Sequence, residues 1–214
     1  MRVIRGFDED AGLNAPVAAI GSFDGVHLGH CRVLRYLCDY AHQTGGDSVV
    51  VTFDPHPQQV LRPNSDFFNI NSLDKNIELI EKQGVDAVLI VPFTQAFSQL
   101  SYSDFIDRYM IGKLRVSTLV MGPNHALGHK RAGGREAIEN LCKERGVHVV
   151  ELPEMVCHDV AVHSAKIRQL ITEGRWNDVD ELLGYHYNVE TQFIASQMKN
   201  VNETVETQFI ASQR

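Results

Sequence analysis

Short apolar runs alternate with longer segments in which apolar residues recur at helical spacing. The apolar runs have the length of buried strands and lie at residues 17–23, 48–53, 87–91, 118–121 and 148–152. The helical pattern covers residues 28–44, 73–83, 101–110, 135–145, 164–173 and 177–183. Because strands and helices alternate, the chain is predicted to form βαβ units and an α/β fold with a doubly wound parallel sheet.

Glycines mark the ends of three of these helices. Gly45, Gly84 and Gly146 each follow a predicted helix and precede a predicted strand. The loops that leave the strands lie at residues 21–30, 54–57, 92–97 and 122–131. Ligands of open α/β sheets bind beyond the carboxyl ends of the strands. The four loops are therefore expected to converge on one crevice.

The charge of the chain limits the partners that it is expected to bind. Its 214 residues include 20 Lys and Arg against 27 Asp and Glu, a formal net charge of −7. This balance argues against a nucleic-acid partner, so an anionic substrate would need a local basic pocket. No basic-then-apolar leader follows Met1, and no apolar run approaches the roughly 20 residues that cross a bilayer. We expect a cytoplasmic protein with no membrane partner.

Four cysteines, Cys31, Cys38, Cys142 and Cys157, form no C-x-x-C pair. They are typical of reduced core thiols.

The loop at residues 21–30 carries the strongest chemical signal. It joins a predicted strand to a predicted helix and contains Gly21, Gly25, His27 and His30. The glycines leave room for backbone to approach a ligand, and the amides at the helix start favour an anion. Two histidines three residues apart can point to the same group on one helical face. Taken alone, the pair is more typical of solvated surface residues or of half a metal site than of a phosphate grip.

Several motifs together carry a resemblance that covers about residues 15–187. They include Gly21-Ser-Phe-Asp-Gly-Val-His-Leu-Gly-His30, Val51-Thr-Phe-Asp-Pro-His-Pro57, Gly122–Gly133 and Ile167-Arg168. In combination they resemble the adenylyltransferase module of bacterial FAD synthetases, a branch of the H-x-G-H nucleotidyltransferase superfamily. The resemblance implies a Rossmann-like nucleotidyltransferase domain at residues 1–187. It also implies a reaction in which the FMN phosphate attacks the α-phosphorus of ATP, giving FAD and pyrophosphate.

The same resemblance assigns residues to the nucleotide. His27, His30 and Arg168 would be the catalytic residues that hold the phosphates, since histidine and arginine supply hydrogen-bond donors to them. ATP would also be bound by Gly21, Ser22, Phe23, Asp24, Gly29 and Ser164. Asp24 is equally typical of a turn. Mg²⁺ would enter on the substrate phosphates, so no protein-built metal site is expected.

Two other loops are candidates for ligand contacts. Lys130 and Arg131 lie between glycines and are either a phosphate clamp or solvated charges. The flavin is assigned by resemblance to Phe53, Pro55, Pro57 and Asn124. The prolines would also simply end a strand and turn the chain.

The chain departs from the family pattern at three places. The family's S-S-T-x-I-R appears as His163-Ser-Ala-Lys-Ile-Arg168, and Ala165 has no side-chain donor. His125 and Leu127 stand where aromatic residues are usual. Only 27 residues follow Tyr187, too few for the riboflavin kinase barrel that usually follows this module. We therefore expect either adenylyltransferase activity alone or a chain truncated at the module boundary, and the sequence does not separate the two. The alternatives are a related enzyme with another phosphorylated acceptor, or a weakly active flavin- or nucleotide-binding protein.

The predicted extension at residues 188–214 contains an exact repeat. Residues 189–197 and 205–213 both read Val-Glu-Thr-Gln-Phe-Ile-Ala-Ser-Gln. The apolar alternation suits half-buried strands, which would pair as a hairpin or dock on a second copy and form a homo-oligomer. A loosely held extension without function explains the pattern equally well.

Overall fold

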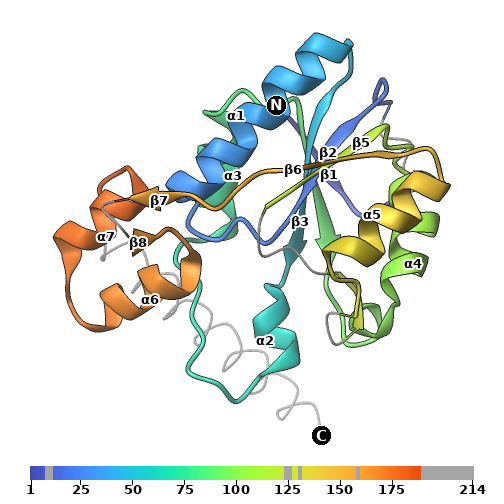
Figure 1. The fold of residues 1–214 in the computed structure, drawn as a ribbon. Coiled ribbons are helices and arrows are strands. Elements are labelled where there is room, and N and C mark those ends of the chain that lie inside the picture. Colours follow the sequence, from blue (N-terminus) through green and yellow to red (C-terminus); the bar gives the residue numbers. More distant parts are fainter. Residues whose placement is uncertain (8–11, 123–126, 130–131, 158–159, 189–214) are drawn as a thin grey trace, which may run out of the picture.

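The computed structural model describes residues 1–7, 12–122, 127–129, 132–157 and 160–188, which form one six-stranded parallel sheet with flanking helices (Figure 1). The sheet order is β1-β4-β3-β2-β5-β6. The strands are Arg2–Arg5 (β1), Val17–Ile20 (β2), Ser48–Asp54 (β3), Ala87–Pro92 (β4), Thr118–Met121 (β5) and His148–Glu151 (β6). The predicted doubly wound parallel α/β fold is confirmed.

Both faces of the sheet are covered, as the fully buried strand β2 shows. Val17 and Ala19 pack with helices α1 (Leu28–Thr44) and α3 (Leu73–Glu81). Ala18 and Ile20 face the opposite core. This core contains residues of α5 (Arg135–Glu144), α4 (Tyr102–Asp104) and η2 (Phe105–Ile111). Successive side chains of a strand point to opposite faces, so a strand in the centre of such a sheet must be apolar throughout.

A third apolar cluster lies beside the carboxyl end of the sheet, at the left in Figure 1. It is formed mainly by α6 (Ser164–Thr172) and α7 (Trp176–Leu183), with the short antiparallel pair β7 (Val156–Cys157) and β8 (Val160–Ala161). Ile70, which is fully buried, brings the segment before α3 into the same cluster.

Helix α1 has the predicted bounds, and both ends have local causes. His27 caps its first turn through a side-chain acceptor. Gly45 has φ 70° and donates to the carbonyls of Ala41 and His42 at the other end. This left-handed cap suits glycine because it has no Cβ.

Some expectations about the elements were wrong. The strand predicted at 17–23 ends at Ile20, because the chain turns sharply before Phe23. The helix predicted at 101–110 is divided into a short α4 (Tyr102–Asp104) and a π-helix, η2 (Phe105–Ile111). Edge strand β1 and the five-residue helix α2 (Pro57–Leu61) were not predicted.

No helix in the described part of the chain has the length and hydrophobicity needed to span a bilayer. Of the predicted extension at 188–214, residues 189–214 lie outside the described residues. The division into a domain at 1–187 and a tail stays a prediction.

Candidate functional site

The site lies at the carboxyl end of β2, where the chain order of the sheet reverses. Strand β2 pairs with β3 on one side and with β5 on the other. Ligands of open α/β sheets bind at such a switch point. The segment that leaves β2 there is residues 21–30, which we call the first loop.

The backbone of the first loop is held in an unusual conformation. Phe23 and Val26 have φ angles of 44° and 36°, and both side chains are buried. Such angles cost of order 1–3 kcal/mol each and persist only where the surroundings impose them. The amide of Gly21 donates to the carbonyl of Val51, and Thr52 Oγ1 donates to the carbonyl of Ser22. Strand β3 therefore fixes the start of the loop.

The place of Gly25 has a packing reason, and the expected approach of a ligand to its backbone stays a prediction. Its φ is 83°, and a Cβ there would lie 3.0 Å from the side chain of Ile70. Its amide donates to Asn76 Oδ1, and its carbonyl accepts from the hydroxyl of Tyr185 at 2.6 Å. The loop is thereby fastened to α3 and to the end of the described chain.

His27 and His30 form a stacked pair at the start of α1. Their ring centroids are 3.7 Å apart with an angle of 15° between the planes. His27 Nδ1 accepts from the amide of His30 at 3.3 Å, which caps the helix. A neutral imidazole that accepts at Nδ1 carries its proton on Nε2. His27 is therefore a donor through Nε2.

Burial keeps both imidazoles neutral. Burial, with smaller contributions from nearby His163 and Arg168, lowers the pKa of His27 to about 3. Burial and the neighbouring His27 hold the pKa of His30 well below its ordinary value. His30 Nδ1 is buried without a hydrogen-bond partner among the described residues. Unpartnered buried polar atoms are rare, and a bound ligand is one way to satisfy them.

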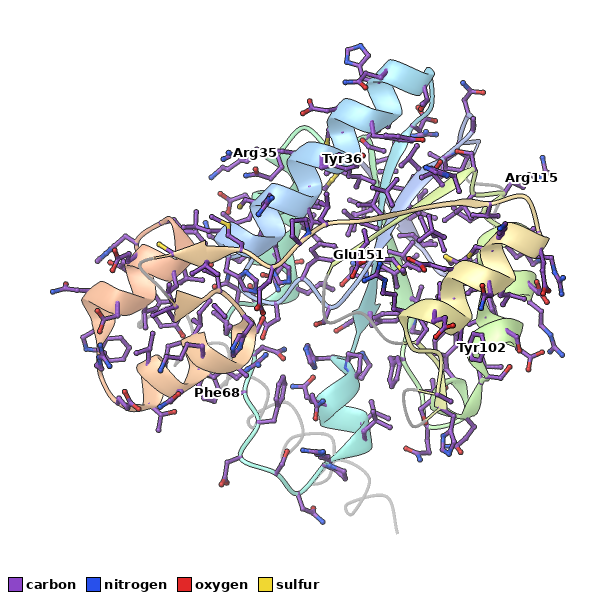
Figure 2. The ribbon with its side chains drawn as sticks, in the orientation of Figure 1. Arg35, Tyr36, Phe68, Tyr102, Arg115 and Glu151 are labelled. Carbon is purple, nitrogen blue, oxygen red and sulfur yellow. The ribbon has the colours of Figure 1, made fainter. Side chains whose placement is uncertain are left out.

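Asp24 and Arg168 form a buried ion pair beside the histidines. The carboxylate of Asp24 accepts from an Arg168 guanidinium nitrogen and from the amides of Ile70 and Asn71. Arg168 Nε donates to the carbonyl of Phe68 at 2.8 Å, and Figure 2 shows Phe68 near α6. The pair links the first loop, residues 68–71 and α6. A ligand contact for Asp24 or Arg168 stays a prediction.

The amino end of α6 lies against that of α1. Ser164 Oγ donates to the carbonyl of Asp24 at 3.0 Å. A Cβ on Gly29 would lie 3.0 Å from the carbonyl oxygen of Val162, so only glycine allows this approach without a shift. Each helix start carries partial positive charge and free amides that favour an anion. The predicted residues His27, Gly29 and Ser164 are thus brought together.

An aromatic pocket of about 480 Å³ lies beyond the ends of β3 and β4. Phe53, Phe93 and Phe97 form its ring cluster, with the Phe53 and Phe93 centroids 5.5 Å apart. It is also lined by Pro57, Gln58, Leu61, Arg62, Ser98, Leu100, Phe105, Leu127, Gly128 and His129. The volume and the mainly apolar lining are typical of small-molecule sites. Phe53 and Pro57 line this pocket and Pro55 does not, while the flavin contacts of all three residues stay predictions.

Several site residues were not predicted. His56 caps α2 by accepting from the amide of Gln58, and its ring lies 4.5 Å from that of Phe67. Burial lowers the pKa of His56 to about 4. Phe93 and Phe97 fall in a loop predicted to reach the crevice, which is the signal that could have singled them out. Asn71, Asn76 and Tyr185 have no local motif that marks them.

Three predicted site residues, Asn124, Lys130 and Arg131, lie outside the described residues. Among the described residues, no group of three or more His, Cys, Asp or Glu side chains is arranged to hold a metal ion.

A family model described as FAD synthetase matches residues 10–166. The chain belongs to the FAD synthetase family. The match includes the first loop and the end of β3, and it stops two residues before Arg168. In this family member, the first loop and the end of β3 both lie at the carboxyl end of the sheet.

Two similar proteins are longer than this chain. A bifunctional riboflavin kinase/FMN adenylyltransferase of Listeria monocytogenes is 35% identical over 175 residues, which are 81% of this chain and 55% of that protein. The Bacillus subtilis protein of the same description is 34% identical and has the same coverage. The chain spans little more than half the length of these relatives.

Two solved structures resemble the fold. A protein from Streptococcus pneumoniae titled a macrolide-efflux protein has a TM-score of 0.78 and 23% identity, covering 87% of this chain and 72% of its own. Pantothenate synthetase from Thermus thermophilus has a TM-score of 0.53 and 13% identity, covering 81% and 77%. At these identities the likeness concerns the nucleotidyltransferase fold alone.

Proposed function

We propose that this chain is an FMN adenylyltransferase that transfers AMP from MgATP to FMN, releasing pyrophosphate. Membership of the FAD synthetase family supports ATP and FMN as its substrates. The observation that carries the proposal is the junction at the end of β2 and β3. There the paired histidines at the start of α1 adjoin the strand that leads into the aromatic pocket.

The histidine side of the junction suits the polyphosphate of ATP. Neutral imidazoles and free helix amides donate hydrogen bonds without a permanent positive charge. The charge of Arg168 is balanced by Asp24. The Mg²⁺ of MgATP would therefore neutralise part of the phosphate charge, and the protein would supply directed donors.

The aromatic pocket suits the isoalloxazine ring of FMN. A flat, conjugated ring gains stacking and edge contacts from Phe53, Phe93 and Phe97. Gln58, Ser98 and His129 in the lining carry polar atoms for the ring's carbonyl and imide groups. The flavin phosphate then points back toward the first loop, because β3 adjoins β2.

In the reaction, an FMN phosphate oxygen forms a bond to the α-phosphorus of ATP. The bond from that phosphorus to the bridging oxygen breaks, and pyrophosphate leaves with the electron pair. The phosphate of FMN is already ionised at neutral pH, so no residue must remove a proton. Catalysis then consists of holding the reactants in line and stabilising negative charge by donation from His27 and His30.

The test is FAD formation by the purified chain from FMN and MgATP, followed by chromatography, with pyrophosphate release measured in parallel. We expect one pyrophosphate for each FAD formed. Riboflavin with MgATP serves as the second reaction, and no phosphorylation is expected from the described domain. FMN binding without pyrophosphate release would instead support a binding protein.

A further inference from the structure

A closed ring of hydrogen bonds holds both backbone polar groups of Gly25 in the first loop. The amide of Gly25 donates to Asn76 Oδ1 at 3.1 Å, and its carbonyl accepts from the hydroxyl of Tyr185 at 2.6 Å. Asn71 Nδ2 completes the ring by donating to Asn76 Oδ1 at 3.3 Å and to the Tyr185 hydroxyl at 2.7 Å. Asn71 and Asn76 are buried. One network therefore fixes the backbone at the middle of the loop.

The hydroxyl of Tyr185 acts in this ring as both acceptor and donor. It accepts from Asn71, and its own proton goes to the carbonyl of Gly25. Burial raises the pKa of Tyr185, so the hydroxyl keeps this proton at neutral pH. The carbonyl of Gly25 is therefore held by a permanent donor.

The carbonyl of Gly25 belongs to the peptide unit that precedes Val26. Val26 has a φ of 36°, an angle that β-branched residues rarely adopt. Such an angle persists only where the surroundings impose it, and rotation of the preceding peptide unit would relieve it. This rotation would break the hydrogen bond to Tyr185, and the residue that follows Val26 is His27. Tyr185 therefore opposes a movement that would displace the histidine pair.

The residue before Tyr185 packs against the start of α1. Gly184 ends α7 with a φ of 77°, and a Cβ there would lie 2.5 Å from the side chain of Leu28. Leu28 is the first residue of α1 and follows His27 directly. The contact with Leu28 and the hydrogen bond to Gly25 thus flank His27 along the chain. The end of α7 is placed to hold the histidine turn on both sides.

We propose that Tyr185 is a positioning residue of the adenylyl transfer, whose hydroxyl holds the peptide after Gly25 and thereby keeps the histidine pair aimed at the polyphosphate. The proposal rests on the proposed function for the reaction and its substrates. Tyr185 acts through the backbone of the first loop rather than through contact with a substrate. Its loss should therefore lower the rate of transfer and leave the binding of FMN unchanged.

Two substitutions release the held peptide from different sides. Tyr185→Phe removes only the hydroxyl and keeps the ring in its apolar cluster. Asn76→Ala removes the acceptor of the Gly25 amide, and alanine suits the helical position of Asn76 in α3.

Ile138→Val is the matched control for stability. Ile138 is fully buried in the apolar cluster on the opposite face of the sheet. Shortening a buried isoleucine lowers stability, here by a route that does not involve the ring of hydrogen bonds. Thermal unfolding of each variant measures the loss of stability separately from the rate.

The first measurement is the rate of FAD formation over a range of FMN concentrations at saturating MgATP. In Tyr185→Phe, kcat should fall about tenfold to a hundredfold, because a displacement of about 1 Å can cost a hundredfold. The KM for FMN should keep its wild-type value. Asn76→Ala should lower kcat by a similar factor, and the double variant should be little slower than either, since both changes release the same peptide. Ile138→Val should keep the wild-type kcat.

The second measurement is hydrogen exchange of the Gly25 and Val26 amides, followed by NMR without substrates. These amides donate to Asn76 Oδ1 and to the carbonyl of Phe23. In Tyr185→Phe, both should exchange about twofold to tenfold faster, which corresponds to the net contribution of one hydrogen bond to a local opening. Their exchange in Ile138→Val should match the wild-type chain.

An unchanged kcat in Tyr185→Phe would overturn the proposal. An equal fall of kcat in Ile138→Val would also overturn it, because the loss of stability alone would then explain the effect. Unchanged exchange of the two amides in Tyr185→Phe would contradict the proposed hold on the loop. Failure of the proposed function gives a different result. A wild-type chain that makes no FAD contradicts the enzyme assignment, whereas faster exchange in Tyr185→Phe would still support Tyr185 as the residue that holds the first loop.

Discussion

The first loop and the aromatic pocket are neighbours built on opposite physical principles. The first loop is fixed by polar contacts. It contains two residues with strained backbone angles and one partner of a buried ion pair, and hydrogen bonds join this loop and the pair to three other segments. The aromatic pocket is lined mainly by side chains of β3, α2, η1 (Phe97–Gln99) and η2 and by Phe93, which directly follows β4, and these side chains are held by apolar contact. Directed donors need a rigid frame, whereas ring packing tolerates adjustment. We therefore expect changes in the first loop to be costly and changes in the pocket to be graded.

Acid should destabilise both regions through their buried histidines, His27 in the first loop and His56 at the start of α2. The folded-state pKa values of His27 and His56 are about 3 and about 4, below the ordinary value of 6.5. Between the folded and ordinary values the unfolded chain binds protons that the folded chain does not, so stability falls as pH falls below 6.5. At pH 4.5 the two histidines together should cost about 5 kcal/mol relative to pH 7.5. Urea unfolding across this range measures the loss.

Because carboxylates also titrate in acid, the comparison is made with His56→Asn. Asparagine can cap α2 but does not titrate. In this variant, the histidine contribution to the loss of stability on acidification should therefore be about half of that in the wild-type chain. An identical pH dependence in both proteins would contradict the assignment of a neutral, buried His56.

Removing one partner of the ion pair should be the most damaging substitution. Asp24→Ala leaves Arg168 without its carboxylate and two amides without an acceptor. Loss of one partner of a buried pair costs about 3–5 kcal/mol. Denaturant unfolding of Asp24→Ala, Arg168→Met and the double variant gives the coupling. If the two losses add without coupling, the pair does not hold the first loop.

His30→Ala tests catalysis on the polar side. Loss of one aimed donor costs about 2.7–4 kcal/mol in the transition state, so kcat should fall about a hundredfold to a thousandfold. FMN binding should stay at the wild-type level, since the flavin contacts lie in the other region. The rate of FAD formation and FMN fluorescence measure the two effects. An unchanged kcat would remove His30 from the mechanism.

Phe93→Leu tests the aromatic side with a smaller change. Leucine keeps most of the apolar volume but loses the ring contacts with Phe53 and Phe97. Aromatic pairs contribute about 0.5–1.5 kcal/mol beyond area, so FMN affinity should fall about two- to tenfold. MgATP affinity should not change. Equal losses for both ligands would show that the two regions are one coupled unit.

The structural features that were predicted from the sequence share one property: each is determined by residues that lie close together along the chain. The bounds of α1 follow from apolar spacing and from Gly45, which lies directly after the helix. The first loop likewise contains its glycines and histidines in ten consecutive residues. The position of each strand of the six-stranded sheet except β1 was predicted from a short apolar run.

The parts that were missed depend on distant contacts. Arg2–Arg5 is an exposed, charged segment that becomes a strand by pairing with β4. Asp24 pairs with Arg168 across 144 positions, and Tyr185 reaches Gly25 across 160. The cap at His56 could not be foreseen either, because histidine is not a usual cap. Such roles are set by the fold, so no pattern in neighbouring residues marks them.

The most direct test of the central claim is a crystal structure of the chain with FAD bound, because that one product spans both regions. We predict the diphosphate at the start of α1, within hydrogen-bond distance of His27 or His30, and the isoalloxazine among Phe53, Phe93 and Phe97. A diphosphate held elsewhere, or a flavin ring outside the aromatic pocket, would contradict the account.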